Sequence, residues 1–303
     1  MPDIKAALGW LFAPSTEEVP KHQAMALTFL RILIGMLWLY NVSWKRAPNF
    51  GEQAENGLWK FTNFAVEYPV FPPFSWVIEN MVQPIFQPFG WVVLLSETAL
   101  AVLLLTGTFI RVAALIGIAQ CIAIALSVAF APEEWPWAYW MMIGAHVVLL
   151  FASSGRYLAV DGLRARVSSA TTLGQVWGGL AVVVGLYSAA LSFGDPLASR
   201  GPGLHSTDLS VSFGYYNLLG GIVLIVVGAM LIVAARRDAD GIAKAAAGLA
   251  VVAGLSLHAQ LGFTDPILGG NPTSAAFLFC LGVIGGAIAL VPSLQHRKDP
   301  VAV

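Results

Sequence analysis

The sequence predicts an all-α polytopic membrane protein with about eight transmembrane helices. Of its 303 residues, 57% are hydrophobic and only 11% are charged, whereas a soluble domain carries roughly 25% charged residues. Eight apolar segments approach the length of roughly 20 residues that a spanning helix needs. So few charges cannot build a water-facing surface, and lipid is therefore expected to cover much of the molecule.

The eight apolar segments are expected, in chain order, at Ala24–Val42, Pro88–Gly107, Phe109–Phe130, Pro136–Ala152, Leu173–Phe193, Tyr215–Ala235, Ile242–Gly262 and Ala275–Val291. The second and third form a tight hairpin around Thr108. The fourth is short, and the tryptophans beside its start are typical of an interfacial anchor. The first 23 residues contain no continuous apolar core, so we expect no cleaved signal peptide.

Basic residues set the expected orientation. With the N-terminus in the cytoplasm, four basic residues lie outside, namely Lys45, Arg46, Lys60 and Arg200. The other twelve lie inside, namely Lys5, Lys21, Arg31, Arg111, Arg156, Arg164, Arg166, Arg236, Arg237, Lys244, Arg297 and Lys298. This bias predicts a prokaryotic cytoplasmic (inner) membrane protein with both termini in the cytoplasm.

Two halves are expected, a four-helix membrane domain at 1–166 and a second one at 167–303. The first holds a long outer loop, 43–87, rich in aromatic residues and prolines. This loop predicts either an ordered cap over the first helices or a lid over a site that opens outward. The second half is predicted to be a parallel repeat of helical hairpins, 173–237 and 242–298.

The repeat is visible in the sequence itself. Gly179–Leu186 reads GLAVVVGL and Gly248–Leu255 reads GLAVVAGL. The first copy is followed by Asp195-Pro196 and the second by Asp265-Pro266. The composition of this half, rich in Gly, Ala and Val, is typical of closely packed membrane helices.

Several function classes are excluded. The net charge of −1 argues against a nucleic-acid partner, which would favour a basic face. Cys121 and Cys280 lie in apolar runs and predict core residues rather than disulfides. No motif for a metal, a phosphate-binding loop or a serine nucleophile is present. Any chemistry must therefore take place in the membrane, on the outer face or in a partner subunit.

Glu97 is the most informative residue, because an isolated charge inside an apolar helix costs several kcal/mol. Candidate partners are Lys45 and Arg46, whose long side chains can reach down from the end of the first helix. Two interpretations stay open: a buried lock between the first two helices, or a carboxylate that handles protons or binds a headgroup. Tyr40 and Asn41 are candidates either to line a site beside Glu97 or to bond across helices.

The remaining polar residues within the apolar segments receive structural interpretations. Arg31 is expected to anchor the first helix at the inner interface. His146 and His258 lie at depths that differ by about 7 Å at 1.5 Å per residue, which argues against a haem held between two histidines. Each is expected to be a satisfied interior histidine. Gln120 and Gln260 are expected to form interhelical hydrogen bonds.

Several scattered positions in the first half form one pattern. The first helix runs from Arg31 to the ending Leu39-Tyr40-Asn41-Val42-Ser43-Trp44-Lys45 and is followed by a proline-rich segment. Glu97 leads the helix 98–107, and the fourth helix closes on Gly155-Arg156-Tyr157-Leu158-Ala159-Val160-Asp161. In this pattern, residues 24–166 resemble the DoxX/DoxD-like family of four-helix membrane proteins. The ending of the first helix departs from the family pattern, since Asn41 to Ser43 contain no glycine.

The resemblance implies membrane redox chemistry near the quinone pool. Some family members belong to thiosulfate:quinone oxidoreductase, and others are accessory subunits of redox complexes. Glu97 and Lys45 match polar positions of the family. We therefore expect a membrane subunit that works with a redox partner and binds quinone or lipid; a thiosulfate:quinone oxidoreductase subunit, a small-solute transporter and a structural scaffold subunit remain alternatives.

Overall fold

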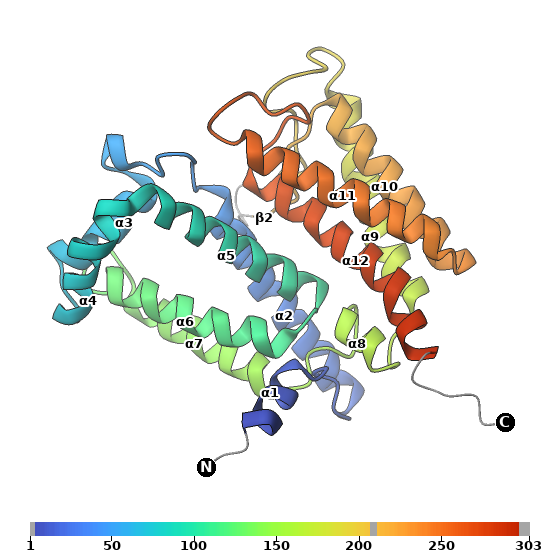
Figure 1. The fold of residues 1–303 in the computed structure, drawn as a ribbon, viewed down its shortest axis with the longest axis horizontal. Helices are drawn as coiled ribbons and strands as arrows, with labels where there is room; N and C mark the ends of the chain where they lie inside the picture. The colour runs from blue at the N-terminus through green and yellow to red at the C-terminus, as the bar shows by residue number, and fades with distance from the viewer. Residues whose placement is uncertain (1–3, 207–210, 297–303) are drawn as a thin grey trace.

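The chain folds almost entirely into helices, as the computed structural model shows (Figure 1). The structure describes residues 4–206 and 211–296, so the predicted cytoplasmic Arg297 and Lys298 lie outside the described residues. Within the described residues, seven helices are long and apolar enough to cross a membrane, and an eighth apolar helix has 16 residues. The predicted class, an all-α polytopic membrane protein, is confirmed at this level.

The first half contains the helices α1 (Ile4–Phe12), α2 (Lys21–Ser43), α3 (Gly57–Glu67), α4 (Pro72–Val77), α5 (Phe86–Thr106), α6 (Ile110–Val128), α7 (Pro136–Phe151) and α8 (Val160–Arg164). Three single turns connect them: η1 (Glu52–Ala54), the π-helical η2 (Ile78–Val82) and η3 (Gln83–Ile85). The second half contains α9 (Ala170–Leu191), the short strands β1 (His205–Ser206) and β2 (Val211–Ser212), α10 (Leu218–Arg237), α11 (Asp240–Gln260) and α12 (Pro272–His296).

Two helix bundles stand side by side (Figure 1). In the first, α2 packs on α5, α6 packs on α7, and α3 lies across α6. In the second, α9 pairs with α10 and α11 pairs with α12. Helix α12 also contacts α2 and α5 of the first bundle. In its most apolar stretch, 72% of the residues are buried, more than in any other long helix. It is therefore the helix that joins the two bundles.

The α9–α10 hairpin is held by glycine contacts at two levels. A Cβ atom on Gly178 would lie 2.6 Å from the Gly228 carbonyl oxygen, and one on Gly185 would lie 2.6 Å from that of Gly221. Backbones can approach this closely only where neither helix carries a side chain. The expectation of closely packed helices in the second half is met at this hairpin.

Helices α10 and α12 begin with the same N-cap interaction. The side chain of Asn217 accepts a hydrogen bond from the Gly220 amide (3.0 Å), and that of Asn271 accepts one from the Ser274 amide (3.1 Å). Asparagine at this position satisfies amides that lack a partner at the helix start. Because of the first cap, α10 begins at Leu218 and not at Tyr215 as predicted.

Arg31 forms a buried tie between helix ends, a set of contacts that the prediction of an interface anchor did not include. Its side chain is fully buried and donates to five backbone carbonyls, those of Leu104, Leu105, Ser154, Tyr157 and Leu158, at 2.5 to 3.1 Å. The last carbonyls of a helix lack partners within the helix. Arg31 therefore satisfies the end of α5 and ties it to the segment between α7 and α8.

Asp161 caps a helix that lies far from it in the sequence. Its carboxylate accepts hydrogen bonds from the backbone amides of Phe109 and Ile110 at the start of α6, each at 3.2 Å. It also accepts one from Arg164 at 2.7 Å. A carboxylate is favoured at this helix end by the orientation of the peptide dipoles. The end of the motif Gly155–Asp161 thus fixes the tight turn between α5 and α6.

Glu17 fastens the segment before α2 to the same end of the first bundle. It pairs with Arg111 and accepts a hydrogen bond from the Ser153 hydroxyl at 2.7 Å. Partial burial raises the pKa of Glu17, but the hydrogen bonds from Ser153 and Arg111 outweigh it and leave the pKa below its ordinary value of 4.5.

Candidate ligand-binding site

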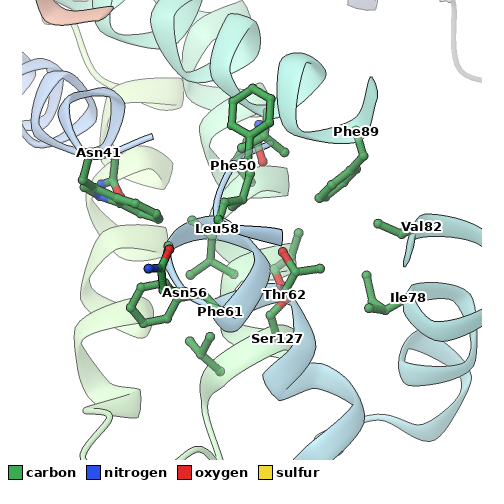
Figure 2. Close-up of a pocket in the computed structure, with 18 of the residues that line it drawn as sticks. Asn41, Phe50, Asn56, Leu58, Phe61, Thr62, Ile78, Val82, Phe89 and Ser127 are labelled. Carbon is green, nitrogen blue, oxygen red and sulfur yellow. The ribbon is translucent and has the colours of Figure 1, made fainter. Parts of the chain in front are cut away.

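A large cavity lies at the α3/α4 end of the first bundle, with a volume of about 970 Å³. We call it the chamber. Its walls come from the end of α2 and the turn after it, from α3, α4 and η2, and from α5, α6 and the start of α7 (Figure 2). The loop predicted as a cap or a lid therefore forms one side of a cavity, because α3 folds back onto α6.

Aromatic rings form much of the chamber wall. Trp44 and Phe61 meet edge to face with ring centroids 5.5 Å apart, and Phe50 meets Trp91 in the same way at 5.6 Å. Edge-to-face contacts of this kind fix ring orientation. Phe50 also fits where α5 has no side chain, since a Cβ atom on Gly90 would lie 2.2 Å from the Phe50 ring. The wall on this side is therefore rigid and apolar.

Helix α3 turns one face toward α6 and the chamber. Leu58, Thr62 and Ala65, spaced three or four residues apart, are buried on this face. Such spacing places side chains on one side of a helix. Helix α3 is therefore amphipathic, and residues 72–82 of the same loop form α4 and η2.

Few polar side chains line the chamber. They are Asn41, Arg46, Asn56, Thr62, Gln120, Ser127, Glu134 and Tyr139, together with the hydroxyl of Tyr40. The Tyr139 hydroxyl donates to Glu134 at the start of α7. An apolar cavity with a few placed polar groups is the usual form of a site for a small molecule.

The Lys45–Glu97 ion pair lies directly behind the chamber wall. Lys45 Nζ is 2.5 Å from Glu97 Oε2, and both side chains are almost completely buried, with 1% and 3% of their surface exposed. Lys45 Nζ also donates to the Asn41 carbonyl at 3.0 Å and lies 3.9 Å from the centre of the Trp44 ring. Of the two predicted cations, Lys45 is thus the one that pairs with Glu97.

The predicted site residues divide into two groups. Tyr40, Asn41 and Arg46 line the chamber. Glu97 and Lys45 do not line it. Lys45 lies behind the wall, where it bonds the carbonyl of Asn41 and meets the ring of Trp44, and both of these residues line the chamber.

Gln120 takes the predicted interhelical hydrogen bond, because its amide donates from α6 to Ser96 on α5 at 2.5 Å. Gln260 does not, because it bonds Ser256 on its own helix and the Ile267 amide after it. Ser127 was missed as a lining residue. It lies seven residues after Gln120 in an otherwise apolar helix, and this spacing, two turns on one face, was the signal.

The two interior histidines differ from each other. His146 accepts a hydrogen bond from the Trp38 indole at 2.9 Å and bonds the Met142 carbonyl at 2.7 Å, so both ring nitrogens are satisfied as predicted. His258 stacks on Phe279, and neither ring nitrogen has a partner among the described residues. The prediction of a satisfied histidine was therefore wrong for His258, because its ring lies against the ring of Phe279 and no polar group of the described residues bonds it.

No family, curated protein or solved structure matches the chain. Among the described residues, no group of three or more His, Cys, Asp or Glu side chains is placed to hold a metal ion. What the fold defines is an integral membrane protein of long apolar helices. Within that class, this chain is distinguished by the aromatic chamber and the buried ion pair behind its wall.

Proposed function

We propose that this chain is a DoxX-like membrane subunit of a redox or respiratory-type assembly and that its chamber binds a quinone. All eight apolar helices, the 16-residue α7 included, span a prokaryotic cytoplasmic membrane. Both termini lie in the cytoplasm, and the chamber lies at the outer end of the first bundle. A redox partner supplies the electron-transfer centre that the sequence of this chain does not encode.

The proposal rests on the size of the chamber and on its aromatic walls. Small-molecule sites have volumes of roughly 300 to 1,000 Å³, and the chamber, at about 970 Å³, is large enough for a substituted ring with the first part of an apolar tail. Its aromatic walls favour a flat ring, since offset or edge-to-face ring contacts contribute about 0.5–1.5 kcal/mol each beyond buried area.

Charge supports the placement of the chamber in the outer half of the membrane. The bias of twelve basic residues against four favours an outer position for the α3/α4 end. Arg31, Arg111 and Asp161 lie at the opposite end, with α1 and α8, toward the inside (Figure 1).

Direct binding tests the proposal. The protein in lipid nanodiscs is titrated with a benzoquinone that carries a ten-carbon tail, and the dissociation constant is measured. Ala123 lines the chamber on α6, and Ala123→Phe should weaken binding at least tenfold by filling it. The control is Ala119→Phe, one turn earlier on the same helix at an exposed position that does not line the chamber, which should bind like the wild type.

Equal binding by Ala123→Phe and the wild type would refute a quinone in the chamber. Extraction of the purified protein adds a second readout, because a tightly held quinone should be recovered from the wild type and lost from Ala123→Phe. Recovery of phospholipid alone, with no quinone binding in the titration, would assign the chamber to a structural lipid instead.

A further inference from the structure

A second, smaller cavity lies between the end of α2 and the loops of the second bundle, with a volume of about 300 Å³. We call it the cleft. It is lined by Leu39, Tyr40 and Ser43 of α2 and by Arg200, His205, Ser206, Val211, Ser212, Tyr215 and Asn271 of the second half. We infer that the cleft is a second binding site and that it takes a phosphate group, held by the guanidinium of Arg200.

Arg200 gives the cleft a fixed positive charge. No acidic side chain is among the described residues that line the cleft, and Arg200 forms no ion pair with a described residue. Its guanidinium lies over the ring of Tyr215, 4.2 Å from the ring centre. A stacked guanidinium keeps its N–H groups in one plane, where two of them can bind two oxygens of a phosphate.

The ring under Arg200 is held from two sides. The Tyr215 amide donates to the Ser274 hydroxyl at 2.9 Å, which ties this residue to the start of α12. The Tyr215 ring also meets the ring of His205, with centroids 5.3 Å apart. The guanidinium is therefore stacked on a positioned ring, and less ordering is needed when a ligand binds.

Two neutral groups of the lining have protons left to donate. The Asn271 side-chain oxygen accepts from the Ser274 amide, so the other terminal atom is the nitrogen, which has no partner among the described residues. The Ser212 hydroxyl accepts from the Gly214 amide at 3.1 Å, and its own proton has no acceptor among them. Both groups can donate to a phosphate oxygen.

The lining also contains acceptors. The Ser43 hydroxyl donates to the Tyr40 carbonyl at 2.6 Å, so its oxygen can only accept a further bond. His205 bonds the Gly203 carbonyl through Nδ1 at 2.8 Å, which leaves Nε2 of the neutral ring as an acceptor. The sign of the ligand is therefore set by the charge of Arg200 and not by a count of donors.

The position of the cleft favours a lipid phosphate over a free phosphate ion. In the topology proposed above, on which this step rests, Ser43 ends α2 at the outer surface, where lipid headgroups lie. Phe29, Leu33 and Leu37 are exposed on α2, and Tyr40 of the cleft follows three residues later. This spacing places them on one side of the helix, so acyl chains can lie along α2 below a phosphate in the cleft.

Three probes test the inference on the full chain in maltoside micelles and phosphate-free buffer. They are inorganic phosphate, dihexanoyl phosphatidylglycerol and dihexanoylglycerol, which has the same chains and no phosphate. Calorimetry gives the dissociation constant of each. We expect the phospholipid to bind at least tenfold more tightly than dihexanoylglycerol, a difference of about 1.4 kcal/mol.

Arg200→Gln should weaken the binding of the phospholipid at least tenfold, because it removes the charge and the planar fork. The residue is exposed, so the variant should fold. The matched control is Lys60→Gln, which also removes an expected outer charge but lies at an exposed position that lines neither the cleft nor the chamber. It should bind all three probes like the wild type.

The two phosphate probes identify the source of the ligand. Tighter binding of the phospholipid than of inorganic phosphate assigns the cleft to a lipid headgroup, and tighter binding of inorganic phosphate assigns it to a free ion; either supports the inference if Arg200→Gln abolishes it. Absence of binding by both phosphate probes, or binding that is unchanged in Arg200→Gln, would overturn it. The quinone titration is made on the chamber, so failure here leaves the proposed function intact.

Discussion

The Lys45–Glu97 pair should behave as a strongly coupled lock between α2 and α5. Glu97→Gln would leave the Lys45 ammonium buried without a counter-ion, beside the neutral Asn41 carbonyl and the Trp44 ring. Lys45→Met would leave the Glu97 carboxylate without its ion-pair partner. Removing one member of a buried pair typically costs about 3–5 kcal/mol, because the other charge stays desolvated.

The double variant Lys45→Met/Glu97→Gln removes both charges and should recover most of that loss. Replacing a complete buried pair by uncharged groups is often neutral or even stabilising. We expect the double variant to be at least about 2 kcal/mol more stable than the less stable single variant. The measurement is the free energy of unfolding in mixed micelles titrated with sodium dodecyl sulfate, for all four proteins of the cycle.

Two outcomes would refute this reasoning. A cost of less than about 1 kcal/mol for Glu97→Gln would mean that the pair contributes no more than a surface ion pair does. Additive losses in the double variant would mean that the two residues act independently. A Glu97→Gln protein of unchanged stability that has lost quinone binding would instead support the interpretation of Glu97 as a functional carboxylate.

The remaining predictions concern the opposite end of the first bundle. Arg31→Lys should lower the free energy of unfolding by at least about 2 kcal/mol, because an ammonium has three donors for five carbonyls. The control is Arg46→Lys, at an exposed position. Equal stability of the two variants would contradict the role of Arg31. Asp161→Ala should cost about 1–2 kcal/mol by removing the α6 cap, which denaturation in the same micelles measures, and Asp161→Asn should recover part of the loss. The pKa of Glu17 is lowered in the folded protein, so its ionised form stabilises the fold. Its contribution to the free energy of unfolding, about 1 kcal/mol or less for an exposed pair, is present above pH 4.5 and lost as the pH falls below it. Unfolding measured from pH 6 to pH 3 should therefore show a smaller loss in Glu17→Gln than in the wild type, and parallel curves would refute the assignment.

The helices were predictable because apolar length alone defines a membrane span. The first was expected at Ala24–Val42 and runs from Lys21 to Ser43, and the turn at Thr108 was placed within two residues. The contacts that were missed are ones that only the tertiary structure creates. Arg31 reads as an interface residue in the sequence, because nothing local shows that five carbonyls converge on it.

The candidate site was predictable only in part. A carboxylate within an apolar helix requires a partner, and Lys45 was one of two cations close enough to supply it. The chamber was not predictable, because its volume depends on how α3 folds back onto α6, some 60 residues further along the chain. His258 shows the same limit, since the sequence places it in a helix but not against the ring of Phe279.

The position of α3 in the chain has a consequence for how the protein is assembled. The ribosome delivers α3 after only one long apolar helix, whereas the surface on which it rests belongs to α6 and becomes available two helices later. The chamber can therefore close only after the chain has reached α6 and the start of α7, which supply part of its wall. A chain truncated before α6 would insert its first helices without a binding site.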